Sequence, residues 1–135
     1  MNKNEMMKDI LLSTETIASV GLSSNMEKAS CAVGSYLQSQ GYRVIPVNPT
    51  ADEILGEKSY PDLESIPEKI DVVQVFRRPE DVPPVVESAI KIGAKVVWMQ
   101  EGIVNEEAAQ MAREAGLQVV MDACMRATHQ LLIRK

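Results

Sequence analysis

The chain has 135 residues, of which 45% are hydrophobic and 24% are charged, and this size and composition are typical of one ordinary globular domain. Its formal net charge of −5 disfavours nucleic acid and anionic membranes as partners. No apolar run approaches the roughly 20 residues of a membrane-spanning helix, and the amino-terminal residues lack the apolar stretch of a signal peptide. We therefore expect a single cytoplasmic domain, residues 1–135, that holds any anionic ligand by a local arrangement of donors.

The sequence does not indicate a metal site or a set of disulfide bonds. Cys31 and Cys124 are far apart, no CxxC motif occurs, and His129 is the only histidine. These are too few ligands for a zinc site and do not form a disulfide framework. We expect no metal, and both cysteines fit a reducing compartment.

Five short apolar segments, most of them rich in β-branched residues, predict strands. They are residues 16–20, 42–47, 70–76, 94–99 and 117–121. Continuous apolar runs of this kind are typical of parallel strands that are covered on both faces.

Helical patterns lie before, between and after these strands. The predicted helices are 5–12, 30–40, 79–92, 106–115 and 128–135. Asn105 is placed to cap the fourth of them. Residues 48–67 show no helical or strand period, so we expect a loop there with room for one short turn of helix.

The alternation of strands and helices predicts an α/β fold. Right-handed crossovers give a three-layer, doubly wound, Rossmann-like parallel sheet of about five strands, most simply in the order 3-2-1-4-5. In such a sheet, ligands bind beyond the carboxyl ends of the strands where the order reverses, here between strands one and four. The segments expected to line this crevice are 21–28, 48–49, 77–79 and 100–102.

The first of these segments reads as an unusual phosphate-binding turn. A dinucleotide-binding loop has the pattern GxGxxG, whereas here only Gly21 matches, and Ser23 and Met26 stand where the second and third glycines would be. A site for NAD also needs an acid near the end of strand two, where this chain has Asn48 followed by Pro49. Both departures count against NAD.

The segment of residues 21–28 nevertheless has groups that can bind an anion. Free backbone N–H groups at a helix start, together with the hydroxyls of Ser23, Ser24 and Ser30, suit a phosphate. The alternative is that Ser23, Ser24 and Asn25 only cap the following helix.

Basic residues are also concentrated at the predicted crevice. Arg77 and Arg78 follow strand three, and Lys28 and Arg43 are expected nearby. In a chain of negative net charge, this concentration favours a phosphate-bearing ligand. The alternative is a solvated rim, and successive side chains diverge on a strand, so that only one of the two adjacent arginines is expected to reach the ligand.

Six short motifs occur in an order that resembles a known family. They are IASVGLSSN, GYRVIPVNP, ILGEKSYPDLESIP, DVVQVFRRPEDVP, IGAKVVWMQEGIVNEEAA and AGLQVVMDACM. Together they resemble the small stand-alone CoA-binding proteins, which are relatives of the amino-terminal domain of the succinyl-CoA ligase α subunit. The resemblance extends from about residue 17 to residue 129.

The resemblance implies which segments hold CoA. In the ligase, the loop after strand one and a Thr-Glu-Gly segment after strand four do so. The positions that correspond are Gly21, Ser23, Ser24, Asn25 and Met26 in the first segment, and Met99, Gln100, Glu101 and Gly102 in the second, with Gln in place of Thr. The ligase also has a CoA-binding lysine just after strand two, which is missing here, and Arg77 or Arg78 is our candidate to replace it.

Catalysis is not expected. The ligase's phosphorylated histidine lies in a further domain, His129 matches nothing catalytic, and no Ser-His-Asp or Cys-His set can be assembled at the crevice. We expect a non-catalytic module that carries or senses CoA or an acyl-CoA, with no nucleic acid or membrane partner. The alternatives are an NAD(P)-dependent oxidoreductase on the same fold and a regulatory interaction protein with an empty crevice. A homodimer and a partner enzyme both remain open.

Overall fold

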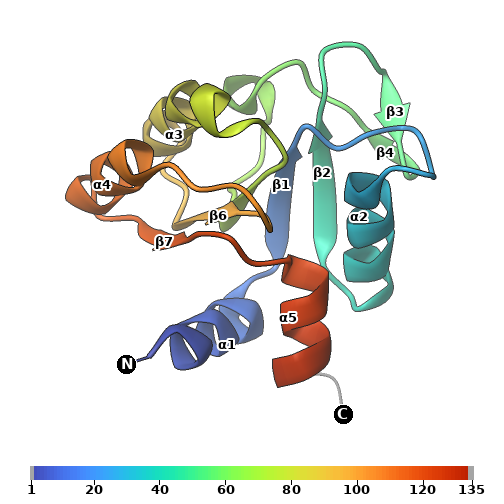
Figure 1. The fold of residues 1–135 in the computed structure, drawn as a ribbon. Helices are drawn as coiled ribbons and strands as arrows, with labels where there is room; N and C mark the ends of the chain where they lie inside the picture. The colour runs from blue at the N-terminus through green and yellow to red at the C-terminus, as the bar shows by residue number, and fades with distance from the viewer. Residues whose placement is uncertain (1, 134–135) are drawn as a thin grey trace.

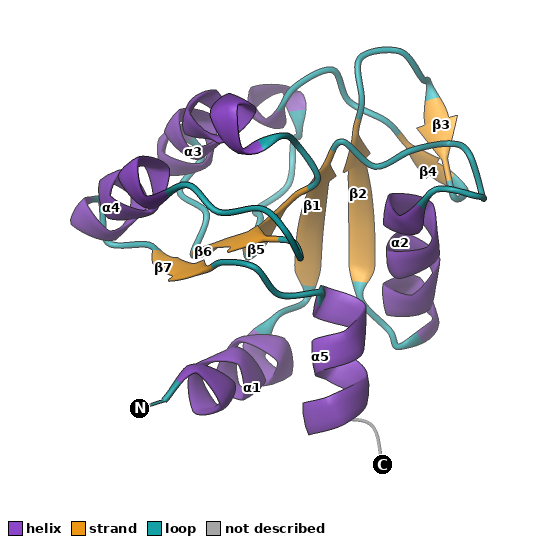
Figure 2. Cartoon of the chain, viewed as in Figure 1, coloured by secondary structure: helices purple, strands orange, loops and turns teal. Residues whose placement is uncertain are grey.

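Five parallel strands form one sheet with helices on both faces in the computed structural model, which describes residues 2–133 (Figures 1 and 2). The strands of this sheet are β1 (Thr16–Val20), β2 (Arg43–Val47), β5 (Val72–Val75), β6 (Val96–Met99) and β7 (Gln118–Val120). A separate antiparallel pair, β3 (Glu53–Ile54) and β4 (Glu57–Lys58), lies beyond β2. The predicted α/β class and the predicted number of strands are confirmed.

One face of the sheet is covered by α1 (Lys3–Ser13), α2 (Ala29–Ser39) and α5 (Met125–Leu132). The strands place Ile17, Val44, Val72 and Trp98 against these helices, and all four side chains are buried. Burial on this face removes a large apolar area from water, at roughly 25 cal/mol per Å².

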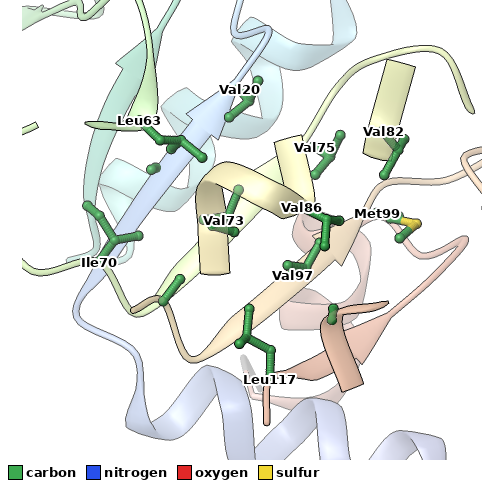
Figure 3. Close-up of a cluster of buried hydrophobic side chains, with 14 of the residues drawn as sticks. Val20, Leu63, Ile70, Val73, Val75, Val82, Val86, Val97, Met99 and Leu117 are labelled. Carbon is green, nitrogen blue, oxygen red and sulfur yellow. The ribbon is translucent and has the colours of Figure 1, made fainter. Parts of the chain in front are cut away.

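The opposite face is covered by the short 3-10 helix η1 (Leu63–Ser65) and by α3 (Val82–Lys91) and α4 (Glu106–Glu114). A second 3-10 helix, η2 (Pro79–Asp81), has no buried residue and leads directly into α3. Figure 3 shows Val82 and Val86 of α3 lying over Val73, Val75 and Val97 of the sheet. Because successive strand residues point to opposite faces, a strand that is buried on both faces must be apolar almost throughout. This requirement explains the continuous apolar runs in the sequence.

The strand order is β2-β1-β5-β6-β7, so the predicted order 3-2-1-4-5 is wrong. The third strand of the chain, β5, pairs with β1 and not with β2. The outer edge of β2 is taken by Tyr60, whose N–H donates to the Pro46 carbonyl at 3.0 Å and whose carbonyl accepts from Asn48 N–H at 2.9 Å. Proline lacks the N–H that an interior strand needs, so a strand that contains Pro46 belongs at an edge of the sheet.

The helices largely follow the predicted pattern. Asn105 caps α4 as expected, because its Oδ1 accepts from Ala108 N–H at 2.8 Å. The last helix begins at Met125, three residues before the predicted start, and residues 134–135 of that prediction lie outside the described residues. Residues 48–67 contain η1, as the expected short turn, and also the β3–β4 pair, which was not expected.

No helix within residues 2–133 is both long and apolar enough to span a membrane.

A candidate ligand crevice at the carboxyl edge of the sheet

The corrected strand order moves the point of reversal. The sheet order now changes direction between β1 and β5, and not between β1 and β6 as predicted. The loop after β1 and the segment after β5, which carries the two arginines, therefore leave the sheet side by side. Topology alone makes this junction the place where a doubly wound fold binds ligands.

Gly21 joins three chain segments at this junction. Its N–H donates to the Val47 carbonyl at 3.0 Å, and Phe76 N–H donates to the Val20 carbonyl at 2.8 Å. Gly21 has φ +91°, and a Cβ at this position would collide with the Phe76 carbonyl oxygen. The one glycine that the loop shares with the GxGxxG pattern is therefore required by the close approach of the chain after β5.

The serine-rich loop of residues 21–28 is shaped by its own hydrogen bonds. Ser30 Oγ accepts from Ser23 N–H, and Ser23 Oγ accepts from Asn25 N–H, both at 3.0 Å. Asn25 Oδ1 in turn accepts from Glu27 N–H at 2.9 Å. Since α2 begins at Ala29 with Lys28 at its N-cap position and has no side-chain cap, the alternative in which Ser23, Ser24 and Asn25 cap this helix is wrong.

Several groups of this loop remain available to a ligand. Ser24 and Lys28 are exposed, and their side chains form no hydrogen bond or ion pair with other residues of the range 2–133. In the first turn of α2, the N–H groups of Cys31 and Ala32 donate to the Lys28 carbonyl at 3.1 and 3.3 Å, whereas those of the first two residues, Ala29 and Ser30, have no carbonyl partner within the helix. Met26 is 66% exposed and its sulfur lies 3.2 Å from the sulfur of the buried Cys31, so it covers that thiol.

Asn48 holds the loops together and offers little to a ligand. Its Nδ2 donates to the Leu22 carbonyl at 3.0 Å, and its Oδ1 accepts from the N–H and the hydroxyl of Thr50 at 2.9 and 2.7 Å. Pro49, the other residue expected here, is exposed.

The two adjacent arginines have different surroundings. Arg78 is exposed and pairs with Glu80 at 3.3 Å and Asp81 at 3.2 Å, both in its own turn. Arg77 is half-buried and forms no ion pair with any residue from 2 to 133. The two side chains therefore differ in burial and in pairing.

Arg43 does not lie near the crevice. It is the first residue of β2, so it stands at the amino edge of the sheet, where it pairs with Glu57 at 3.0 Å and with Glu68. The hydrogen bond from Arg43 holds the pKa of Glu68 below its ordinary value.

Arg77 lines a cavity of about 190 Å³ on the α3 side of the sheet. The cavity reaches from the ends of β1 and β2 to η1 and α3, and its lining includes Val20, Val47, Asp62, Leu63 and Val85. Asp62 Oδ1 is held by the N–H and the hydroxyl of Ser65, at 2.8 and 2.6 Å. Sequence reasoning missed Asp62, Leu63 and Val85, and the Asp-Leu-Glu-Ser spacing of a short capped turn was the one available signal for the first two.

The first two residues of the segment expected after β6, Met99 and Gln100, are buried and serve the fold itself. Met99 is buried in the core, and Gln100 is 4% exposed, with its Oε1 accepting from Gln74 Nε2 at 3.2 Å and from Met125 N–H at 3.0 Å. Gln100 therefore caps the start of α5.

The next two residues of that segment reach the surface. Glu101 and Gly102 are exposed, and Gly102 N–H donates to Asp122 Oδ1 at 2.7 Å.

A larger cavity, of about 560 Å³, lies at the opposite edge, lined by Leu11, Glu15, Tyr42, Arg43 and His129 among others. Its cation and its imidazole are already engaged, since Arg43 is ion-paired and His129 Nδ1 lies 2.8 Å from the Tyr36 hydroxyl. No group of three or more possible metal ligands was found within residues 2–133. The carboxyl edge is therefore the stronger candidate for a ligand.

Comparison with known proteins identifies relatives of this chain and solved structures with the same fold. An uncharacterized protein of Bacillus subtilis, YneT, is 46% identical over 123 residues, which is 91% of each chain. A solved structure described as a hypothetical protein from Pyrococcus horikoshii is 44% identical, with a TM-score of 0.95 over 98% of this chain and 93% of that one. An ADP-forming acetate–CoA ligase II of Archaeoglobus fulgidus is 30% identical over 83 residues, which is 60% of this chain and 12% of the ligase.

The model of a family described as the CoA binding domain matches residues 15–130, which is most of the chain. This match confirms the family resemblance expected from the six ordered motifs. The chain belongs to the CoA binding domain family.

Proposed function

We propose that this protein binds coenzyme A or an acyl-CoA at the carboxyl edge of its sheet, as a non-catalytic carrier or sensor. The observation that carries the proposal is the meeting of two unsatisfied groups at the reversal between β1 and β5. One is the exposed loop of residues 21–28, which leads into the start of α2, and the other is Arg77, which forms no ion pair within residues 2–133. Family membership supplies the ligand class.

The phosphates are the part of CoA that this edge suits best. A helix start binds anions through its free N–H groups and its dipole, which contributes about 0.3–1 kcal/mol, or up to about 2 when partly buried. Ser24 and Lys28 add an exposed hydroxyl and an exposed cation beside it. In a chain of net charge −5, these local donors must do the binding.

A role as an NAD(P)-dependent oxidoreductase is the weaker candidate. The ribose hydroxyls of NAD are normally held by an acid near the end of the second strand. Here Asn48 occupies that place, and its amide is engaged by Leu22 and Thr50. The one histidine, His129, lines the cavity at the opposite edge, and we assign the crevice no reaction.

Native mass spectrometry tests the proposal directly. The purified protein would be measured as isolated and after addition of CoA, acetyl-CoA, NAD and NADP. We expect a CoA or acetyl-CoA adduct and none for NAD. An adduct with NAD alone, or none with any of the four, would contradict the proposal.

A charge substitution tests whether the loop after β1 takes part. We expect Ser24→Glu to weaken CoA binding by about tenfold or more, because a carboxylate would oppose the ligand phosphate at a helix start. Isothermal titration calorimetry would measure the change. Gln118→Glu is the matched control, because it adds the same charge at an exposed position at the amino edge, and it should leave the affinity unchanged.

A further inference from the structure

We propose that Arg77 recognises the 3′-phosphate of coenzyme A, so that this protein distinguishes CoA from dephospho-CoA. The inference rests on the proposed function and makes it more specific. It assigns the cation of the site to the segment after β5, in a chain whose residues 48–57, directly after β2, include no lysine.

The site has two separate places for negative charge, one on each side of the sheet. The loop of residues 21–28 leads into α2, and its buried residue Leu22 packs in the core on the α2 side. Arg77 lines a cavity whose Val20, Val47 and Leu63 belong to the core on the α3 side. Figure 1 shows α2 and α3 well apart on either side of β1. A ligand that satisfies both places must carry two anionic groups.

Coenzyme A carries two such groups, and their chemistry fixes which goes where. The pyrophosphate is attached to the 5′ carbon of the ribose, and a separate phosphate is attached to its 3′ oxygen. A pyrophosphate at the reversal of a doubly wound sheet sits at the helix start after the first strand, which is α2 in this chain. The 3′-phosphate then lies toward the cavity that Arg77 lines.

The cavity has a size that suits the adenine end of CoA. Its volume of about 190 Å³ is below the range of about 300–1,000 Å³ typical of sites that enclose a whole drug-sized molecule, and it can take one ring system. Val20, Val47 and Leu63 give it apolar walls. With the adenine inside, the ribose that bears the 3′-phosphate stands at the mouth of the cavity.

The charged side chains at the mouth of the cavity determine how the ligand is oriented there. The guanidinium of Arg77 forms no ion pair with residues 2–133, whereas Arg78 beside it is neutralised by Glu80 and Asp81. Asp62 lines the same cavity, and its carboxylate repels a phosphate while it can accept a hydrogen bond from the ligand. The phosphate therefore lies against Arg77, where a guanidinium can donate two hydrogen bonds.

The test compares CoA with dephospho-CoA, which lacks only the 3′-phosphate, by isothermal titration calorimetry. We expect the wild-type protein to bind CoA about 10- to 100-fold more tightly. Arg77→Gln should weaken CoA binding by about the same factor and leave dephospho-CoA within about threefold. Arg77→Lys should keep part of the preference, because the charge remains and the paired donors do not.

Arg78→Gln is the matched control, because it removes the same charge from the next residue, and it should preserve the preference for CoA. Circular dichroism melting of each variant would establish that it is folded. Equal wild-type affinity for the two ligands, or equal weakening of both in Arg77→Gln, would overturn the role of Arg77 while leaving CoA binding intact. If the wild-type protein binds neither ligand, the proposed function itself fails.

Discussion

The two edges of the sheet differ in whether their charged groups are paired with other residues. At the amino edge, Arg43 is paired with Glu57 and Glu68, and Asp71 accepts from the N–H groups of Glu15 and Thr16 at 3.0 and 3.1 Å. Asp71 also pairs with Lys95 at 3.4 Å. The charges of this edge hold the chain together.

At the carboxyl edge, charged and polar groups are left available. Arg77 has no ion pair within residues 2–133, and Ser24 and Lys28 are exposed in the loop that leads into α2. Charged groups without partners do little for stability, and the proposed function assigns them to the binding of a ligand. Substitutions at the amino edge should therefore change stability, and those at the carboxyl edge should change binding.

Gly21 is the main exception to this division and has the largest expected effect. Gly21→Ala should destabilise the protein by about 3 kcal/mol, because the residue has φ +91° and its Cβ would meet the Phe76 carbonyl. Urea unfolding followed by circular dichroism would measure the loss. CoA binding should weaken as well, because the loop can relieve the collision only by moving away from β5.

Gly41→Ala is the control at the amino edge. Gly41 also has a positive φ, of +95°, but a Cβ there would meet nothing within 4 Å. The expected cost is about 1 kcal/mol, from backbone strain alone. If Gly21→Ala and Gly41→Ala were equally stable, the close contact with the Phe76 carbonyl would not explain why residue 21 is a glycine.

The sequence was informative where local patterns decide the structure. Apolar runs located every strand of the main sheet to within two residues at each end, and Asn105 marked the start of α4. The strand order was predicted wrongly even though Pro46 carried the relevant signal, since a strand with proline in it belongs at an edge.

The candidate site was harder to predict because its parts are far apart in the chain. Residues 48–67 have no periodicity, and although the Asp-Leu-Glu-Ser spacing indicates a capped turn, it does not say that Asp62 and Leu63 lie at the cavity beside Arg77. Gln100 was assigned to ligand binding from its position after the fourth strand. Its role in capping α5 depends on Met125, which is 25 residues away. Contacts between residues so far apart in the chain depend on how the chain folds, and they cannot be predicted from a single sequence.

The acid dependence of stability tests the amino edge. Burial raises the pKa of Asp71, but the hydrogen bonds from Glu15 and Thr16 and the charge of Lys95 outweigh it, so the pKa lies below its ordinary value of 3.8. A carboxylate with a depressed pKa stabilises the fold at any pH above its unfolded value, and this contribution disappears as the pH falls through the folded value. Stability should therefore decline as the pH is lowered below about 4.

Asp71→Asn should remove part of this dependence. We expect a loss of about 1 kcal/mol at pH 7, because the variant loses the ion pair with Lys95 and the charge on the two hydrogen bonds. Urea unfolding at pH 7 and at pH 3 would show a smaller difference for the variant than for the wild type. CoA affinity should not change, and a variant as acid-sensitive as the wild type would contradict this role for Asp71.

Arg43→Gln should have the smallest effect on stability and gives the sharpest contrast with Arg77. Its side chain is 46% exposed, and pairs of exposed charges contribute about 0–1 kcal/mol, so the loss should stay below about 1 kcal/mol. The hydrogen bond from Arg43 lowers the pKa of Glu68, and in the variant this pKa should rise toward its ordinary value, which NMR titration of the carboxyl group would detect. CoA affinity should stay at the wild-type value, although Arg43→Gln removes the same charge as Arg77→Gln. An equal loss of affinity in the two variants would mean that the binding edge responds to the net charge of the protein, and the distinction between the two edges would no longer hold.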